Sequence, residues 1–371
     1  MQRPANRERM SERYVVIMAG GKGERFWPQS RESTPKHLLP IVGDKSMLAQ
    51  TVDRVAGVVP RENIFIITTS AQLEGCRGAC PDLPEANIIA EPMGRDTAAA
   101  TGLAMLLVKQ RNPDAAFAML PADHVIRDTA EYAKLLSIAF ESAESADVLV
   151  TLGIKPTGPE TGFGYIQQSG LWRQIGGRDV MSVKRFVEKP DLETAQGYLA
   201  AGGYYWNAGM FVWRVPVVAA AFKAHAAELS AGLSQLESAA RSAGGWTAAL
   251  AGVYPTLKKV SVDYAIMEKS TNVVVVPATF DWDDVGAWPA LAKHFTPDAA
   301  GNVLRGHAMV EQGTHNIVIS TDGHLVGVIG VSDLVVVHTE GATLVCPKDR
   351  AQEIKALLER IKQDPAKQKF L

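Results

Sequence analysis

The sequence predicts an α/β protein whose core is a mixed, mostly parallel sheet. Short apolar runs alternate with longer amphipathic stretches over residues 14–154, and this alternation is typical of parallel sheets with right-handed crossovers. Several runs show no polar alternation, as expected for strands that are buried on both faces. Ligands of such sheets bind beyond the carboxyl ends of the strands. The loops that follow the apolar runs are therefore the first candidates for a functional site.

Strands and helices are expected in turn along the first part of the chain. Helices are expected after plausible N-caps at Ser46 in "SMLAQTVDRVAGV" and at Thr97 in "TAAATGLAMLLVKQ". The expected strands are "YVVIMA" (14–19), "NIFIITT" (63–69), "ANIIAEP" (86–92), "AAFAMLPAD" (115–123) and "DVLVTLGI" (147–154). The loops after the first and fourth of these strands should share one crevice.

The pattern changes at about residue 155. Residues 155–215 look like β structure with glycine turns and a short helix near "LETAQGYLAAG" (192–202), which could be a subdomain inserted against the first sheet. Residues 217–250 are alanine-rich and expected to be helical. "NVVVVPATFDWDDVGAW" (272–288) returns to a strand and a tight polar turn.

The tail is expected to form a small β-rich unit that ends in a helix. Its apolar runs are separated by turns at 321–323, near 332–333 and at 340–341. The last helix, "DRAQEIKALLERIKQ", places Ile354, Leu357, Leu358 and Ile361 on one stripe. We expect this unit to serve packing or oligomerisation. The predicted division of the chain is a mobile N-terminal arm (1–13), a large α/β domain (14–295) and the small C-terminal domain (296–371).

Composition excludes several classes of protein. The net charge of −2 over 371 residues provides no basic field for nucleic acid. No window approaches the roughly 18 uninterrupted apolar residues of a membrane span, and the charged N-terminus is not a signal peptide. The three cysteines form no obvious disulfide framework or zinc set, which favours a reducing cytoplasm.

The segment "AGGKGERFWP" (19–28) predicts an anion-binding loop. Its glycines let the backbone approach a ligand, and successive N–H groups can bind an anion. The spacing does not fit G-x-x-x-x-G-K-[ST]. It does not fit G-x-G-x-x-G either, because Gly21 and Gly23 would require a glycine where Phe26 stands. Lys22 and Arg25, followed by Lys36 in "TPKHLLP", favour phosphate over a turn without a ligand.

At this point the sequence resembles the sugar-nucleotide pyrophosphorylases, which join a nucleoside triphosphate to a sugar 1-phosphate. The signature "AGGKGERFWPQSRESTPKHLLPI" is followed in the family's order by "EPMGRDTAAATGLA" (91–104), "LPADHVI" (120–126), "FGYIQ" (163–167), "FVEKPD" (186–191), "YYWNAGMFVW" (204–213), "SVDYAIMEKS" (261–270) and "FDWDDVGAW" (280–288). The forms "EPxGRxTA", "LPADH", "WNAGMF" and "DYAIME" resemble the mannose-1-phosphate guanylyltransferase branch more than the glucose-1-phosphate branches. The resemblance covers roughly residues 14–290 and implies a Rossmann-like nucleotidyltransferase domain.

The resemblance implies that GTP and mannose 1-phosphate give GDP-mannose and pyrophosphate. A sugar-phosphate oxygen would attack the α-phosphorus in line, and because this oxygen is already an anion, no general base is needed. The site must instead position the substrates and neutralise the triphosphate. This argues against His124 as a catalytic base and for a role in packing or in supporting the residues that contact the substrate. The resemblance also implies Mg²⁺ and a homodimer, for which the C-terminal unit is a candidate interface. From the composition we expect neither nucleic acid nor a membrane as partner.

The resemblance also assigns roles to individual residues. Arg25, Lys36 and Lys189 would act on the phosphates, with Lys189 meeting the sugar phosphate. Asp123 and Asp284 would bind Mg²⁺, and aligning W-x-D-x-G on Trp282 selects Asp284 over its neighbours Asp281 and Asp283. The nucleotide would be bound by Gly20, Gly21, Gly23, Glu91, Gly94, Arg95 and Thr97. The sugar would be bound by Gly164, Glu188 and Asn207.

Some alternatives stay open at this stage. Asp96 stands where the family more often has Asn, and Ala99 stands where Pro is frequent. A carboxylate near phosphates is unfavourable unless Arg95 pairs with it. A pyrophosphorylase for another sugar or base, or a catalytically silent sensor of nucleotide sugars, remains an alternative. We expect no phosphomannose isomerase activity, because the chain ends before the isomerase domain that longer relatives carry.

Overall fold

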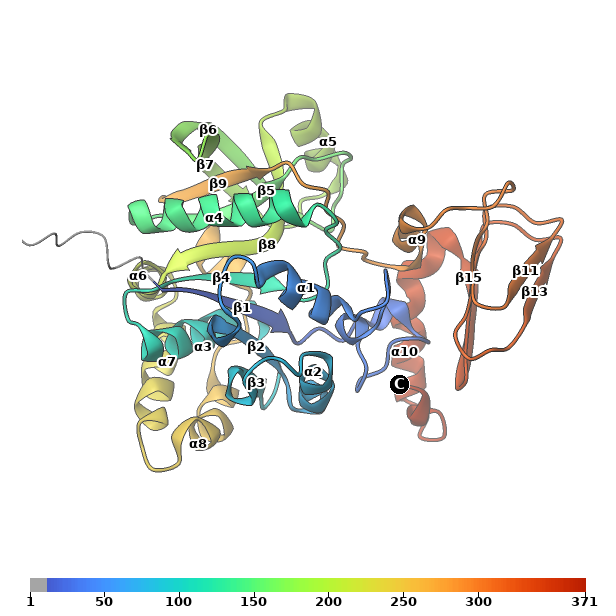
Figure 1. The fold of residues 1–371 in the computed structure, drawn as a ribbon, viewed down its shortest axis with the longest axis horizontal. Helices are drawn as coiled ribbons and strands as arrows, with labels where there is room; N and C mark the ends of the chain where they lie inside the picture. Colours follow the sequence, from blue (N-terminus) through green and yellow to red (C-terminus); the bar gives the residue numbers. More distant parts are fainter. Residues whose placement is uncertain (1–11) are drawn as a thin grey trace, which may run out of the picture.

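The computed structural model describes residues 12–371 and contains one large sheet and a smaller β-rich unit (Figure 1). The predicted N-terminal arm lies, except for its last two residues, outside this range. The large sheet has nine strands in the order β3-β2-β1-β4-β8-β5-β9-β7-β6. Its strands are β1 (Arg13–Ala19), β2 (Ile64–Thr69), β3 (Ile88–Glu91), β4 (Ala116–Pro121), β5 (Leu149–Ile154), β6 (Gly164–Ile175), β7 (Arg178–Val187), β8 (Tyr204–Arg214) and β9 (Val273–Ala278).

Most strands of the large sheet run in one direction. β3, β2, β1 and β4 are parallel neighbours, and so are β5 and β9. β8 runs antiparallel between β4 and β5, and β7 runs antiparallel to β9 and β6. The predicted mixed, mostly parallel α/β class is therefore confirmed. The interpretation of residues 155–215 as an inserted subdomain is wrong, because β6, β7 and β8 are strands of the same sheet and β8 lies between β4 and β5.

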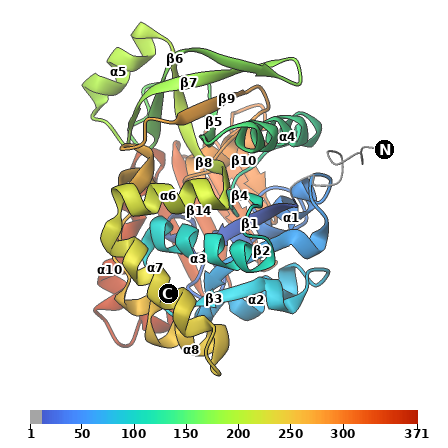
Figure 2. The same cartoon turned by 90° about the vertical axis from the view of Figure 1, so that its left-hand side faces the viewer.

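Helices cover both faces of the large sheet. Val15 and Ile17 of β1 pack with one set of helices, whereas Tyr14 and Val16 face the other set. The first set is α1 (Met47–Val55), α2 (Leu73–Ala79) and α4 (Thr129–Ser145). The second set is α3 (Asp96–Arg111), α6 (Val215–His225), α7 (Ala227–Ala240) and α8 (Gly245–Gly252), of which α3, α6 and α7 lie across the near face in Figure 2. The short helix α5 (Leu192–Ala201) follows β7 as expected.

One of the two predicted helix caps is correct. The Ser46 hydroxyl accepts a hydrogen bond from the Ala49 N–H at the start of α1. The prediction of Thr97 as N-cap is wrong, because α3 already begins at Asp96. The Thr97 hydroxyl instead accepts a hydrogen bond from the Val262 N–H at 2.8 Å. The Thr97 hydroxyl, which would have capped the helix, is therefore used in a tertiary hydrogen bond.

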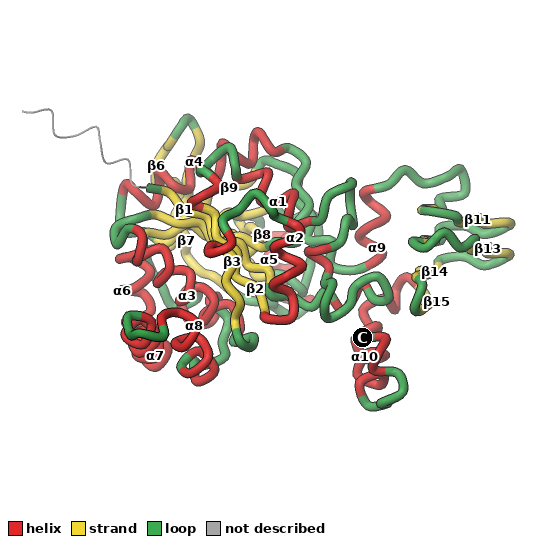
Figure 3. Tube along the Cα trace, turned by 60° about the horizontal axis from the view of Figure 1, so that its bottom comes forward, coloured by secondary structure: helices red, strands yellow, loops and turns green. Residues whose placement is uncertain are grey.

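The C-terminal unit is built from short parallel strands stacked in successive coils. β10 (Val303–Arg305), β12 (Ile317–Ser320) and β14 (Leu334–Thr339) pair in parallel, as do β11 (Ala308–Glu311) and β13 (Val326–Ile329). β15 (Ala342–Pro347) returns antiparallel to β14. Figure 3 shows these strands and their loops projecting beside the large domain, with α10 (Ile354–Lys362) next to them. The predicted β-rich unit with a terminal helix is confirmed.

The C-terminal unit packs against the glycine-loop segment of the large domain. Phe26, Trp27 and Trp288, the last on the short helix α9 (Trp288–Leu291), share a buried cluster with Val335 and Ile354. The Trp27 indole also donates to the Phe370 carbonyl at 2.8 Å. Figure 1 shows α10 (red) beside this segment (blue). The unit is therefore fixed close to the expected phosphate loop.

The predicted apolar stripe of the last helix is correct in three positions and wrong in one. Ile354, Leu358 and Ile361 of α10 are buried, whereas Leu357 is 38% exposed. The first residues of the predicted helix form a 3₁₀ segment (Lys348–Glu353), so the α-helical face starts at Ile354. Positions 354, 358 and 361 then lie on one line, and Leu357 falls on its flank.

Candidate active site

The glycine loop follows β1 and folds back onto Lys36. Gly23 has φ 62°, and a Cβ there would lie 2.5 Å from the Cβ of Lys36, so only glycine fits. A Cβ at Gly20 would lie 3.6 Å from Glu91, whereas nothing lies within 4 Å of a Cβ at Gly21. The loop thus closes tightly on the protein at Gly23 and leaves open space at Gly21.

Lys36 joins three segments that are far apart in the sequence. Its side chain is 5% exposed, and its ammonium donates to the Asp123 carbonyl at 2.8 Å and to the Asp123 carboxylate at 3.0 Å. It also donates to the backbone carbonyl of Asp284. Asp123 lies just beyond β4, and Asp284 lies in the turn after β9. A single buried cation therefore places the two predicted metal ligands beside the glycine loop.

These groups line a cleft of about 420 Å³. Its wall includes Gly23, Arg25 and Lys36 from the glycine-loop segment and Asp123 and Asp284 from the strand ends. The expectation that the loops after β1 and β4 share one crevice is confirmed. The cleft also contains Lys22, Glu24, Phe26, His124, Gly286 and, from the C-terminal unit, Lys355.

Four cationic side chains and three carboxylates line this cleft, so cationic groups are in excess. Arg25 makes only a long contact to the Gly286 carbonyl, at 3.5 Å. Among residues 12–371, no carboxylate lies within ion-pair distance of Arg25 or Lys355. A larger hollow of about 550 Å³ lies near α1 and α2, but there Asp53 already pairs with Lys45 and Arg61. The cleft at Lys36 is therefore the better anion site.

The two carboxylates of the cleft differ in their electrostatic setting. Burial raises the pKa of Asp284 to about 6, and the charges of Asp283 and Asp123 add to this, while Lys36 opposes it. Burial also disfavours ionised Asp123, but the neighbouring Lys36 ammonium outweighs it and lowers the pKa of that carboxyl. Burial and the repulsion between the two carboxylates disfavour their charged forms, and a hard divalent cation such as Mg²⁺ bound to both would offset this.

The neighbouring aspartates are occupied elsewhere. Asp281 accepts hydrogen bonds from the Arg127 and Asp128 N–H groups. Asp283 accepts one from the Val285 N–H at 2.7 Å and lies 3.1 Å from His294. Val285 itself is buried and has φ 43°, a strained conformation for a β-branched residue. The turn is thus held so that Asp284 faces the cleft.

A second group of predicted residues lies where β6, β7 and β8 meet. Gly164 pairs with Asn207 across β6 and β8. A Cβ at Gly164 would lie 2.4 Å from Glu188 Oε2, so a side chain there would displace the Glu188 carboxylate. Lys189, which has φ 47°, contacts Glu188 Oε1, while the buried Oε2 has no hydrogen-bond partner among the described residues. A hydroxyl donor from a ligand would satisfy this oxygen.

Asp263 belongs to this group, although the sequence analysis did not single it out. Its carboxylate accepts a hydrogen bond from the Asn207 amide at 2.8 Å. Burial, with the Glu188 charge added, raises the pKa of Asp263 to about 7. Glu268 contributes as well, because it accepts the Glu188 N–H at 2.9 Å. Both acids lie in "SVDYAIMEKS", a motif that indicates the family but does not by itself show which of its residues belong to the site.

A third group surrounds the start of α3. Glu91 lies at the end of β3, and its buried carboxylate accepts a hydrogen bond from the Tyr254 hydroxyl. Burial raises the pKa of Glu91 to about 7. Asp96 has φ 65°, a region that Asp and Asn tolerate better than most residues, and it accepts the Thr97 N–H at 2.7 Å. No atom lies within 4 Å of a Cβ at Gly94, which leaves space for a ligand.

Aromatic side chains connect the Lys36 cleft with the Glu188 group. The Trp282 indole donates to His124 Nδ1 at 3.1 Å, and the two rings make an edge contact. Phe163 packs on Trp282 and also on Trp206, next to Asn207. Burial lowers the pKa of His124 to about 4, which keeps its ring neutral. His124 is thus placed for packing, in line with the role expected from the chemistry.

Comparison with known proteins decides the family. A family model described as nucleotidyl transferase matches residues 14–301, and one described as the mannose-phosphate isomerase/GMP-like beta-helix domain matches residues 307–361. A mannose-1-phosphate guanylyltransferase of Escherichia coli is 38% identical over 94% of this chain and 74% of its own length. The chain belongs to the mannose-1-phosphate guanylyltransferase family of nucleotidyl transferases.

Other members of the guanylyltransferase family are similarly close. The alginate biosynthesis protein AlgA of Pseudomonas aeruginosa is 37% identical over 93% of this chain and 71% of its own length. The crystal structure of a mannose-1-phosphate geranyltransferase from Thermus thermophilus matches 95% of this chain and 99% of its own, with TM-score 0.83 and 34% identity. A Helicobacter pylori mannose-6-phosphate isomerase shares the fold, with TM-score 0.58 and 23% identity.

The family includes proteins of polysaccharide synthesis, such as the alginate protein above and a xanthan biosynthesis protein of Xanthomonas campestris, which is 38% identical over 95% of this chain. In the present chain, no helix within residues 12–371 is long and apolar enough to cross a membrane.

Proposed function

We propose that this chain transfers GMP from GTP to mannose 1-phosphate and releases pyrophosphate. The observation that carries the proposal is the Lys36 junction, which brings the glycine loop, Asp123 and the Asp284 turn to one cationic cleft. The cleft has positive groups for a triphosphate and carboxylates for its cation. It needs no general base, because the attacking phosphate oxygen is already an anion near neutral pH.

The nucleotide phosphates are proposed to lie along the glycine loop. Gly23 lines the cleft, Gly21 leaves open space beside it, and the N–H groups of Gly20, Gly21 and Gly23 would bind the phosphates. Arg25, which makes only a long contact to the Gly286 carbonyl, would contact the departing pyrophosphate. Lys36 neutralises charge that develops during in-line attack at the α-phosphorus. When bound, Mg²⁺ at Asp123 and Asp284 would supply further charge neutralisation on the triphosphate.

The sugar phosphate is proposed to occupy the Glu188 group. The unpartnered Glu188 Oε2 would accept a sugar hydroxyl, and the Asn207 side chain would contribute a second polar contact. Gly164 keeps this space free of a side chain. The half-exposed Lys189 ammonium would meet the phosphate of the sugar. The contacts of the Trp282 ring with Phe163 and His124 fix the position of this group relative to the cleft.

The base is proposed to lie near the end of β3 and the start of α3. Glu91, Gly94, Arg95 and Thr97 are the predicted contacts. Open space at Gly94 and the carboxylate of Glu91 support this placement. The loop that carries Val262 and Asp263 touches both Thr97 and Asn207, so it links the base and sugar sides.

One assay tests this function. The purified chain is incubated with Mg²⁺, each of the four nucleoside triphosphates and a panel of sugar 1-phosphates, and pyrophosphate release is measured. GTP with mannose 1-phosphate is expected among the best pairs. Preference for another pair would replace this proposal by a pyrophosphorylase of that specificity. No release with any pair would favour a silent sensor of nucleotide sugars.

We further propose that the chain forms a homodimer through the C-terminal unit and works in the cytoplasm. Met309 and Ile329 lie on the outward face of the β11–β13 pair and are 63% and 74% exposed. Covering such apolar side chains would stabilise a dimer.

The three cysteines are free thiols, two of them buried, which fits a reducing compartment such as the cytoplasm. The division into domains at about residue 295 also stays a proposal.

A further inference from the structure

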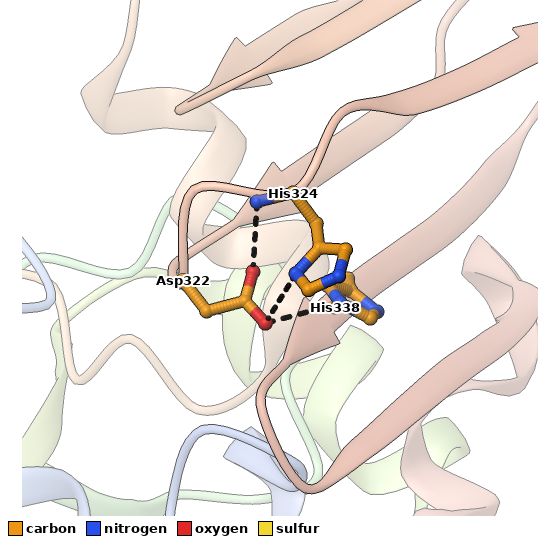
Figure 4. A group of neighbouring side chains, drawn as sticks. All are labelled: Asp322, His324 and His338. Carbon is orange, nitrogen blue, oxygen red and sulfur yellow. Dashed lines mark hydrogen bonds and ion pairs between the residues drawn. The ribbon is translucent and has the colours of Figure 1, made fainter.

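We propose that Asp322, His324 and His338 form a binding site for a zinc-type divalent transition metal in the C-terminal unit, separate from the nucleotide cleft. The three side chains each offer one ligand atom, and these atoms lie within 4.8 Å of one another (Figure 4). Two imidazoles and a carboxylate are the ligands that Zn²⁺ and related ions prefer. Asp322 and His324 lie in the turn after β12, and His338 lies on β14.

The distances within the cluster suit a tetrahedral metal. Asp322 Oδ2 lies 3.1 Å from His324 Nδ1 and 3.1 Å from His338 Nε2. With metal–ligand bonds of about 2.0–2.2 Å, neighbouring ligand atoms of a tetrahedral site are about 3.3–3.5 Å apart. Two of the three edges are therefore nearly in place. For the remaining edge, between the histidines, the ligand atoms lie within 4.8 Å of each other, and the 71% exposed side chain of His324 has room to adjust to a metal.

Surrounding hydrogen bonds orient two of the proposed ligands. The other oxygen of Asp322 accepts the His324 N–H at 3.2 Å and faces the Ser320 hydroxyl at 3.4 Å, which turns Oδ2 toward the imidazoles. His338 Nδ1 lies 2.7 Å from the Thr343 hydroxyl. If Nδ1 donates this bond, Nε2 is the unprotonated atom that a metal needs.

His338 Nε2 is the least satisfied atom of the cluster. It is buried and, despite its closeness to Asp322 Oδ2, lacks a well-aligned hydrogen bond with any described residue. Buried polar atoms without a partner are uncommon and call for an explanation. A metal bound between Nε2 and Oδ2 would provide one.

The metal would tie two coils of the β-helix together. Ser320 of β12 pairs with His338 of β14, and the Thr321 N–H donates to the His338 carbonyl, so the turn already rests on the next coil. Three protein ligands leave one position for water or for a donor from another molecule. We expect the metal to stabilise this unit without taking part in nucleotidyl transfer.

Metal titration of an untagged full-length chain tests the proposal. The chain is first stripped with a chelator and then titrated with Zn²⁺ in excess Mg²⁺, so that the carboxylates of the nucleotide cleft are occupied. We expect one Zn²⁺ per chain, a rise in Tm on binding, and visible absorption bands of a nitrogen- and oxygen-coordinated ion when Co²⁺ replaces Zn²⁺. Failure of the parent chain to bind Zn²⁺ at micromolar concentration would overturn the proposal.

Variants assign the bound metal to this cluster. His324→Gln/His338→Gln is expected to lose the bound Zn²⁺ and the rise in Tm, whereas His307→Gln, an exposed histidine of the same unit, keeps both. Asp322→Asn provides the same readout if the double variant does not fold. Undiminished Zn²⁺ binding by the folded double variant, or equal loss in His307→Gln, would show that the cluster is only a set of hydrogen bonds.

Discussion

The indole N–H of Trp282 donates to Nδ1 of His124 at 3.1 Å and thereby ties the Asp284 turn to the segment that carries Asp123. The two predicted metal ligands come from positions far apart in the chain. This bond, together with the Lys36 junction, fixes their relative positions. Because Phe163 also packs on Trp282, the same indole touches the predicted sugar side.

We expect Trp282→Phe to lower both the stability of the protein and the positioning of Asp123 and Asp284, while the fold survives. The variant keeps an aromatic ring but loses the donor, and a lost hydrogen bond of this kind costs about 1 kcal/mol. Denaturant unfolding should show this loss, and kcat should fall several-fold because the carboxylates are less well positioned. Trp172→Phe, on β6, is the control and should leave kcat unchanged. Equal kcat in the two variants would contradict the role of Trp282.

Asp284→Asn is expected to lower kcat by about two orders of magnitude or more. The change removes a charged oxygen ligand that the site would offer to Mg²⁺, and it keeps the size of the side chain. Steady-state pyrophosphate release over a range of Mg²⁺ concentrations measures both kcat and the requirement for the ion. A higher Mg²⁺ requirement is expected in addition to the lower kcat.

Asp281→Asn is the matched control for this variant. Its carboxylate accepts backbone N–H groups at Arg127 and Asp128 rather than facing the cleft. We therefore expect a modest loss of stability with kcat close to that of the parent. Near-normal turnover by Asp284→Asn, or an equal loss in both variants, would refute the assignment of Asp284 over its neighbours.

Glu91→Gln is expected to change how stability depends on pH. Burial raises the pKa of Glu91 from 4.5 to about 7. The folded state then binds a proton more tightly than the unfolded state, so its stabilising effect is complete below pH 4.5 and is lost as the pH rises through 7. The shift corresponds to about 3 kcal/mol. The neutral glutamine removes this dependence, while its amide oxygen can still accept the Tyr254 hydroxyl.

Denaturant unfolding of parent and Glu91→Gln between pH 4.5 and 8 measures the difference. The two proteins should be similarly stable at the acidic end, and the variant should gain relative to the parent toward pH 8. Asp263, whose pKa is raised to about 7 by burial, acts in the same window but is common to both proteins and cancels. A constant difference across the pH range would show that Glu91 does not titrate as described.

Local patterns predicted the elements well and the tertiary contacts poorly. The first five strands and the Ser46 cap are encoded in contiguous residues, so their signals could be read directly. Thr97 failed as a cap because its hydroxyl is used by Val262, whose approach no local pattern reveals. The antiparallel position of β8 between β4 and β5 likewise depends on long-range pairing.

The same distinction explains what was missed in the site. Asp263 was missed because it lies 56 positions from Asn207, and their hydrogen bond forms only because the chain before residue 263 reaches the start of β8. Lys355 was read as part of an amphipathic helix, since nothing in its neighbourhood of the sequence points to phosphate. Its place in the cleft follows from the packing of α10 against the glycine-loop segment.

Met309→Asp/Ile329→Asp is expected to yield monomers if the proposed dimer forms through the β11–β13 face. The paired register puts both side chains on the exposed side of these strands, and two added charges on each copy would oppose association. Light scattering after gel filtration measures the mass. Leu171→Asp, an exposed apolar residue on β6 of the large domain, is the control and should leave the mass unchanged.

Lys355→Ala is expected to weaken binding of GTP while leaving the fold intact. The side chain is exposed and comes from the C-terminal unit, yet it lines the same cleft as Arg25 and Lys36. An exposed charge of this kind contributes up to about 1 kcal/mol, so KM for GTP should rise about two- to five-fold, with a smaller effect at high salt. KM for the sugar 1-phosphate should stay the same, because the Glu188 group is separate. Lys348→Ala, which is not among the residues of the cleft, is the control. An unchanged KM for GTP in Lys355→Ala would limit the C-terminal unit to packing and association.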